Sequence, residues 1–188
     1  TYLGGSDQLT QELKKLRSRY FKSIGEEKRR IEDDFKKIQI KLLQTFSIWN
    51  SKDQKSQLLS MWNPFSSEQS NWFNPDWMFG INDGFDIVIA NPPYGADIDN
   101  LTDLYGNLYP ETSKGFKDIY KYFFNRSLDD FLNQDGVLCY ITPNTFFLQP
   151  RYGDLRRLLL KHNIKMLISL GEDVFEAVVP TAISLVNS

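Results

Sequence analysis

The tetrapeptide Asn91-Pro92-Pro93-Tyr94 carries groups that could hold a planar amine. The side chain of Asn91 offers an amide oxygen, and the carbonyl of Pro92 is a second acceptor that the following proline ring keeps still. The ring of Tyr94 offers a flat face for stacking. Two hydrogen bonds to these acceptors would draw a planar NH₂ group toward tetrahedral geometry, which makes its lone pair available for attack on an electrophile. This chemistry needs no side-chain nucleophile.

These four residues follow an apolar run, FDIVIAN at 85–91, which predicts a strand that is covered on both faces. The prolines must end this strand, because they cannot donate to a sheet ladder. In open α/β sheets ligands bind beyond the carboxyl ends of the strands, and residues 91–94 occupy that position. The sequence therefore predicts a binding site at the end of this strand.

The elements that follow alternate between helix and strand. Apolar runs predict strands at 135–143, 164–171 and 181–188, and amphipathic patterns predict helices at 117–134 and 153–163. This alternation predicts an α/β fold with a mainly parallel sheet. The connection between the last two strands is too short for a crossover helix, so we expect that pair to be antiparallel.

The segment before this fold has a helical pattern. Residues 7–49 place apolar side chains at steps of three and four, and Gly25 with the Ser23–Glu26 pair predicts either a hairpin or a bend. A loop over 62–85 follows, and its aromatic side chains should pin it to the domain. These are Trp62, Phe65, Trp72, Phe73 and Trp77. We therefore predict a helical insertion or hairpin at 1–62 and an α/β domain at 63–188.

Two polar stretches lie within the α/β part. The stretch from 95 to 117 is predicted to be a mobile lid that closes over a substrate. The basic stretch at 151–165 could touch phosphate, but its spacing favours a solvated helix face.

Composition excludes several classes of protein. The 188 residues carry a net charge of −2, which argues against a general polyanion binder. Cys139 and His162 are single residues of their kinds, so an internal disulfide is excluded and a metal site is not expected. No run approaches the length of a membrane span and no signal peptide is visible, so we expect a cytoplasmic protein without membrane contact. The chain begins at Thr1, and we expect it to be a piece of a longer polypeptide.

A resemblance to a known family rests on several stretches. NPPY after FDIVIA resembles motif IV of the S-adenosylmethionine-dependent amino-methyltransferases. DIYKYFFNRSLDDFLNQDGVLCYITPNTFF resembles the helix and strand that follow in gamma-class adenine-N6 DNA methyltransferases, and YGDLRRLLLKHNIKMLISLGEDVF resembles the next helix, strand and Phe-bearing loop. The aromatic-rich segment upstream is similar to the methyltransferase part of type IIG restriction-modification enzymes. The resemblance covers residues 62–188 well and the preceding helices only loosely.

The resemblance implies methyl transfer from S-adenosylmethionine to the N6 amine of an adenine that is flipped out of DNA. Asn91 and Pro92 would hold the amine, with Pro93 completing the rigid motif. Tyr94 would stack on one face of the base, and Phe175 would form the opposite wall. Phe123 matches a position that lines the cofactor's adenine pocket, and Asp118 on the same helix motif is a second candidate for cofactor binding.

The resemblance further implies a partial Rossmann-like sheet with an N-terminal helical segment. This chain would supply strands four, five, seven and six, side by side, while the cofactor loop and first strands of the family are not recognised in it. Gly4–Gly5 is interpreted as a leading loop, not as the cofactor turn. We expect the N-terminal helices or a second copy of the chain to cover the edge of strand four.

On the same grounds the isolated fragment should be inactive. Its expected partners are the missing N-terminal half of the polypeptide and double-stranded DNA, which a recognition domain outside this chain would bind.

Two other hypotheses remain open at this stage. The motif suits any planar amine, so cytosine-N4, an RNA adenine or a protein glutamine are alternative substrates. A third interpretation is a non-catalytic interaction module built around the helices of 7–49.

Overall fold

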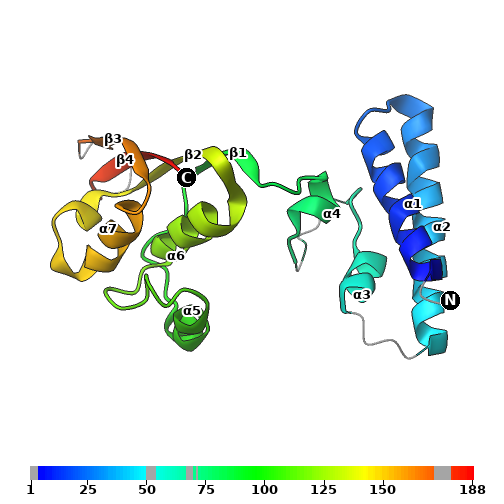
Figure 1. The fold of residues 1–188 in the computed structure, drawn as a ribbon, viewed down its shortest axis with the longest axis horizontal. Helices are drawn as coiled ribbons and strands as arrows, with labels where there is room; N and C mark the ends of the chain where they lie inside the picture. Colours follow the sequence, from blue (N-terminus) through cyan, green and yellow to red (C-terminus); the bar gives the residue numbers. More distant parts are fainter. Residues whose placement is uncertain (1–3, 50–53, 67–69, 71, 172–178) are drawn as a thin grey trace. The chain divides into compact units, whose positions relative to one another are not determined.

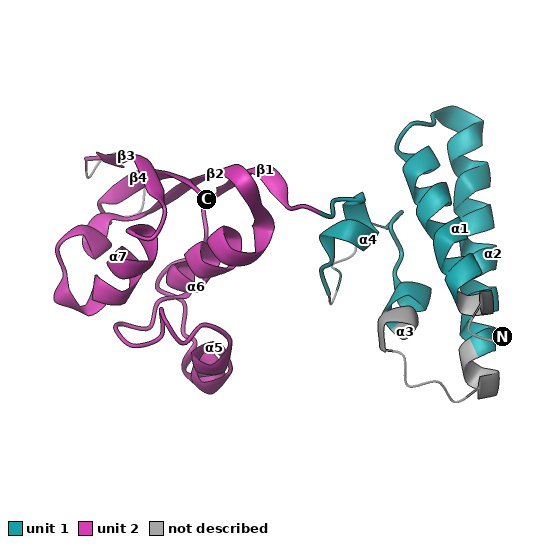
Figure 2. Ribbon diagram, viewed as in Figure 1, with its two compact units in different colours: residues 1–82 teal, residues 83–188 magenta. Residues whose placement is uncertain are grey.

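The computed structural model describes residues 4–49, 54–66, 70, 72–171 and 179–188. The chain divides into two compact units, residues 1–82 and residues 83–188 (Figure 2). The predicted boundary after residue 62 therefore lies too early. None of the described helices combines the length and the apolar character that crossing a membrane requires.

The first unit is built on a helical hairpin. Helix α1 (Gly4–Tyr20) and helix α2 (Gly25–Trp49) lie side by side (Figure 1), which decides between the predicted hairpin and the predicted bend. The turn uses Gly25, whose φ of 61° favours glycine. Because α1 begins at Gly4, the interpretation of Gly4–Gly5 as a leading loop is wrong.

The aromatic-rich segment packs on this hairpin, and this explains the later boundary. Helix α3 (Gln54–Met61) precedes this segment, and the segment itself contains α4 (Pro75–Phe79). Lys14 of α1 forms an ion pair with Asp76 of α4 at 2.7 Å, and Arg17 donates to the Asp76 carbonyl at 2.6 Å. The aromatic side chains that join the helical core are Trp62, Phe65, Trp72 and Trp77, whereas Phe73 is exposed and contacts the ring of Phe79.

The second unit contains a four-stranded sheet in the order β1-β2-β4-β3. The strands are β1 (Phe85–Ala90), β2 (Leu132–Pro143), β3 (Asn163–Ser169) and β4 (Thr181–Asn187). Strands β1 and β2 pair in parallel, and β4 pairs antiparallel with both β2 and β3. The predicted strand order and the antiparallel last pair are confirmed. The sheet is mixed, since β1, β2 and β3 share a direction and β4 runs against them.

Helices cover one face of this sheet. Helix α6 (Ile119–Arg126) continues through η2 (Ser127–Phe131), and α7 (Gly153–Leu159) follows η3 (Asn144–Phe147) and η4 (Pro150–Tyr152). Their side chains form one core with the inward residues of the strands. The fully buried members include Tyr120, Phe124, Leu138, Leu155, Ala182 and Val186.

The other face is open within the second unit as described. Ile87 and Ile89 of β1 are 61% and 74% exposed, although the apolar run predicted a strand covered on both sides. The register places Ile89, Cys139, Leu185 and Met166 in one row across this open face. The described part of the second unit does not supply the predicted cover on this face, because the apolar character of a strand does not reveal which segment covers it.

The predicted lid contains ordered structure. Residues Asp99–Leu101 form η1 and Thr102–Leu108 form α5, in a stretch that was expected to be a mobile loop. Tyr105 of α5 stacks on Tyr122 of α6 with ring centroids 4.6 Å apart, and Tyr109 stacks on the same ring at 5.7 Å. These contacts dock α5 on α6 and explain why the stretch is helical.

A buried ion pair joins α6 to α7. The Lys121 ammonium lies 2.8 Å from the Asp154 carboxylate, and both side chains are almost fully buried. Burial lowers the pKa of Lys121, while its hydrogen bond to Asp154 opposes that change. The ammonium also donates to the Phe116 carbonyl at 2.6 Å, and the Gly115 amide donates to Asp154 at 2.9 Å. The segment before α6 is thereby fixed against the start of α7.

Gly115 has no room for a side chain at this junction. A Cβ there would lie 1.9 Å from the carbonyl oxygen of Arg151. We expect Gly115→Ala to lower the free energy of unfolding by about 1–3 kcal/mol or more, because backbone atoms must move apart. Gly106→Ala is the matched control, since nothing lies within 4 Å of that position. Urea denaturation of both variants checks the prediction, and equal stability of the two would contradict it.

Candidate functional site

The end of β1 presents the groups that the sequence singled out. Asn91 and Pro93 are exposed, Pro92 is buried, and Tyr94 is half-buried against the core of the second unit. Within the described part of the chain, no group donates to the carbonyl of Pro92, and the side-chain amide of Asn91 makes no hydrogen bond. Neither acceptor is therefore used by a described group, and the Asn91 side chain is exposed.

The turn after Tyr94 is held by Asp118. Gly95 adopts a φ of 68°, which favours glycine, and its amide donates to one carboxylate oxygen of Asp118 at 3.4 Å. The Tyr152 hydroxyl donates to the other oxygen at 3.3 Å. Asp118 thus connects the turn after β1 to the segment before α7. Its predicted contact with a cofactor stays a prediction, but its carboxylate is directed to this turn.

Burial governs the charge of Asp118. The residue is 7% exposed, and burial raises the pKa of its carboxyl above 3.8, although the bonds from Gly95 and Tyr152 oppose the change. The charged form therefore lies in a less favourable environment than it would have in water.

Phe123 lines a cavity of about 420 Å³ beside β1. Val88 and Ala90 of β1 and Ile119 of α6 contribute to the same wall, together with Tyr105 of α5. The Phe123 side chain is 39% exposed, although it continues the apolar stripe of α6. A cavity with these walls suits a flat ring with apolar faces.

Phe175, the predicted second wall for a base, lies outside the described residues. The structure instead reveals aromatic residues that were not singled out as site residues, namely Tyr105, Tyr109 and Tyr122, beside the cavity of Phe123. The i, i+4 spacing of Tyr105 and Tyr109 was the available signal. This spacing places the two tyrosines on one face of a helix, but it does not reveal that they stack on the ring of Tyr122.

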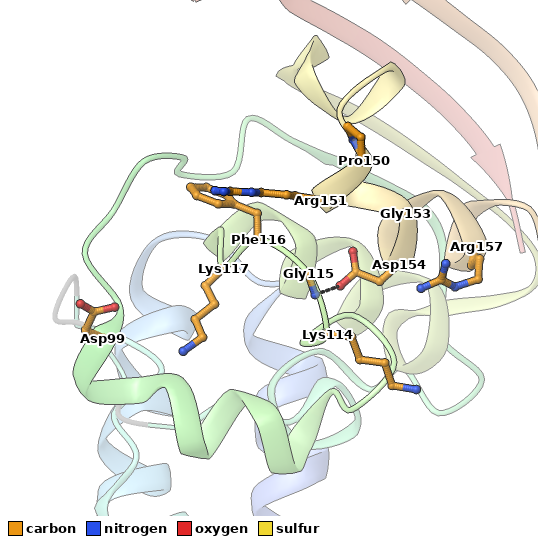
Figure 3. Close-up of a pocket in the computed structure, with 10 residues that line it drawn as sticks. All are labelled: Asp99, Lys114, Gly115, Phe116, Lys117, Pro150, Arg151, Gly153, Asp154 and Arg157. Atoms are coloured by element: carbon orange, nitrogen blue, oxygen red, sulfur yellow. Dashed lines mark hydrogen bonds between the residues drawn. The ribbon is translucent and has the colours of Figure 1, made fainter.

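The basic stretch 151–165 divides into two groups. Arg156 donates to the carbonyls of Phe146 and Gln149, and Lys161 pairs with Glu111. Arg151 and Arg157 instead line a cavity of about 790 Å³. Figure 3 shows Lys114 and Lys117 around the same space. Sequence analysis did not identify these two lysines, because only the fold brings them to the arginines.

The burial of Asp118 has a consequence for stability. Its folded-state pKa lies above the unfolded value, so the native state binds its proton more tightly and this residue stabilises the fold more as pH falls. Wild type and Asp118→Asn should therefore be compared by urea denaturation between about pH 7 and about pH 4. We expect the stability of wild type relative to the variant to increase toward acid. An increase toward neutral pH would mean that the hydrogen bonds outweigh burial.

Comparison with known proteins places the chain in a family. The model of the Eco57I restriction-modification methylase family matches residues 6–175. A protein of Methanocaldococcus jannaschii, described as a type II restriction enzyme and methyltransferase, is 35% identical over 102 residues, which are 50% of this chain and 8% of that protein. Modification methylase CviBIII of Paramecium bursaria Chlorella virus NC1A is 27% identical over 96 residues, which are 48% of this chain and 23% of the methylase.

The chain thus spans less than a quarter of the length of either curated relative. A solved structure from Listeria monocytogenes, described as a class I S-adenosylmethionine-dependent methyltransferase, resembles 57% of this chain and 33% of that one, with a TM-score of 0.48 and 19% identity. The sequence-based resemblance to restriction-modification methyltransferases is confirmed. Because the family model matches residues 6–175, the chain belongs to the Eco57I restriction-modification methylase family.

Proposed function

We propose that this chain is part of a DNA methyltransferase of a restriction-modification system that methylates the N6 amine of adenine. The observation that carries the proposal is that no described group donates to the side-chain oxygen of Asn91 or to the carbonyl of Pro92, at the end of β1 in a member of a methylase family. S-adenosylmethionine would supply the electrophilic methyl group.

The residues of the strand end would act by orientation. The Asn91 side-chain oxygen and the Pro92 carbonyl accept the two N–H groups of the amine, which directs its lone pair toward the methyl donor. Pro93 restricts the backbone at this point. Because it has no backbone N–H, it cannot compete with the substrate amine for these acceptors. By analogy with a single oxyanion-hole donor, one such contact contributes about 3 kcal/mol to the transition state.

The flipped base would stack on Tyr94, which packs against the core and so presents a supported ring. Asp118 would keep this ring in place by holding the amide of the following residue, Gly95. Phe175 is proposed as the opposite wall. An adenine inside a duplex must leave the stack to reach this strand end, at a cost of a few kcal/mol.

The cavity beside Phe123 fits part of the proposed cofactor. The aromatic and aliphatic walls of this cavity suit an adenine ring. Ala90, the residue before Asn91, is one of the lining residues, so the cavity reaches the end of β1. We propose that the remaining parts of the cofactor bind residues outside this chain.

Further segments of the polypeptide would complete the catalytic domain at the open edge and the open face of β1. β1 pairs on one side with β2, and its outward isoleucines are exposed. The curated relatives contain far more chain than this protein shares with them. We propose that further strands of the same polypeptide pair with the edge of β1 and that further segments cover its open face, because an unpaired apolar edge invites pairing and a parallel sheet is stable when both of its faces are covered.

The first test concerns Asn91. In the complete polypeptide encoded by the gene, Asn91→Ala should lower the rate of methyl transfer about 100- to 1,000-fold, since one fixed acceptor is lost. The measurement is transfer of labelled methyl to duplex DNA under saturating cofactor. Analysis of the product nucleoside distinguishes N6-methyladenine from N4-methylcytosine.

Two controls separate this role from a structural one. Asn163→Ala changes an exposed asparagine at the far end of the sheet and should leave the rate unchanged. Phe123→Ala should raise the cofactor concentration needed for half-maximal rate while kcat is largely kept. Retained transfer by Asn91→Ala, or methyl groups found on cytosine alone, would contradict the proposal.

The second test concerns the edge of β1. Hydrogen exchange of the β1 amides that do not pair with β2 should be slower in the complete polypeptide than in residues 1–188, while β4 amides serve as the internal reference. Equal exchange in the two proteins would refute pairing with further strands. Protection in residues 1–188 that increases with protein concentration would instead indicate a second copy on this edge.

A further inference from the structure

A cleft of about 790 Å³ in the second unit is lined by four basic side chains, and we call it the cationic cleft. Its basic residues are Lys114, Lys117, Arg151 and Arg157. All four are exposed, and Figure 3 shows them around one space between the segment before α6 and the start of α7. They come from two stretches of sequence that only the fold brings together.

The charge of this cleft is only partly compensated within the described residues, where Asp99 lines it and Glu111 interacts electrostatically with Lys114. None of the four basic side chains has an ion pair or hydrogen bond there, unlike Lys161, which pairs with Glu111. Two carboxylates also line the cleft. Asp154 is occupied by Lys121 and by the amide of Gly115, which leaves Asp99 against the four cations. In a chain of net charge −2, this is a local concentration of positive charge.

The walls of the cleft are held before any ligand arrives. The Phe116 amide donates to the Arg151 carbonyl at 2.9 Å, and the buried pair of Lys121 and Asp154 lies directly behind. The close approach of Gly115 to Arg151 allows no side chain between the two segments. A ligand would therefore not have to order these backbones, although it would still order the long side chains.

The cleft is connected to the turn after β1 through Asp118 and Tyr152. Lys117 precedes Asp118 in the chain, and Arg151 precedes Tyr152. Asp118 and Tyr152 are hydrogen bonded to each other, and Asp118 holds the Gly95 amide after Tyr94. Two of the cations are thus one residue away from the contacts that position the proposed base-binding motif.

We infer that the cationic cleft binds the sugar–phosphate backbone of a nucleic acid beside the target nucleotide. Arginine guanidinium groups match phosphate oxygens in a two-pronged geometry, and lysines add charge without a fixed direction. Phosphate contacts of this kind fix the register of a strand and carry no sequence information. The inference rests on the proposed function in that the substrate is a nucleic acid.

The test uses fluorescence anisotropy with a labelled DNA duplex and the whole 188-residue chain. Arg151→Gln combined with Lys117→Gln should weaken binding at least about tenfold at low salt, and should reduce the slope of log K against log salt by about 2. The matched control is Arg29→Gln combined with Lys165→Gln, which removes the same charges from exposed positions outside the cleft. The control should keep the wild-type slope.

Lys114→Gln with Arg157→Gln is an independent second variant, in case the first does not fold as judged by circular dichroism. An RNA duplex of the same sequence and inorganic pyrophosphate are the other probes. Cleft-dependent binding of either polymer supports the inference. Equal weakening by the control, no binding at low salt, or displacement by pyrophosphate without any change of salt slope would overturn it.

The outcome of this binding test can be distinguished from the outcome of the methyl-transfer test of the proposed function. If the complete polypeptide methylates DNA through Asn91 but the cleft variants keep the wild-type salt slope, the cleft inference fails alone. If binding depends on the cleft but no methyl transfer occurs, the proposed function fails alone. Asn91→Ala is expected to leave the salt slope of binding unchanged, because it removes no charge.

Discussion

The ammonium of Lys121 and the carboxylate of Asp154 meet in the interior of the second unit, and the arrangement of the site depends on them. Two charges can be removed from water only if their remaining hydrogen-bonding positions are used. The Phe116 carbonyl and the Gly115 amide fulfil that condition here. As a result the segment before α6 cannot shift relative to α7, and both the wall of the cationic cleft and the position of Asp118 follow from it.

Around this fixed point, the site separates positioning from chemistry. Buried groups, Asp118 above all, hold the backbone after β1, whereas the exposed Asn91 and the Pro92 carbonyl have no partner in the described chain. An acceptor held by rigid neighbours needs little reorganisation when an amine arrives. The same division is present in the cleft, where backbone contacts hold the walls and the basic side chains are exposed.

Sequence reasoning reached the antiparallel last pair, because a short connection restricts topology strongly, whereas the strand order came from the family resemblance. It failed where contacts with residues far away in the sequence determine the local structure. The helix α5 depends on the ring of Tyr122, and the aromatic segment after residue 62 depends on the helical hairpin. A candidate site could be proposed from the sequence where its residues are consecutive, as in 91–94, and its role stays a prediction. The cationic cleft was missed because its two halves are far apart in sequence.

The position of β4 has a consequence for how this sheet forms. It is the last strand along the described chain, yet it lies between β2 and β3 and pairs with both. During synthesis, β3 therefore leaves the ribosome without any neighbour, and β2 has only β1. The order of the four strands is complete only when β4 has inserted, and until then the apolar strands β2 and β3 lack the partner that lies between them.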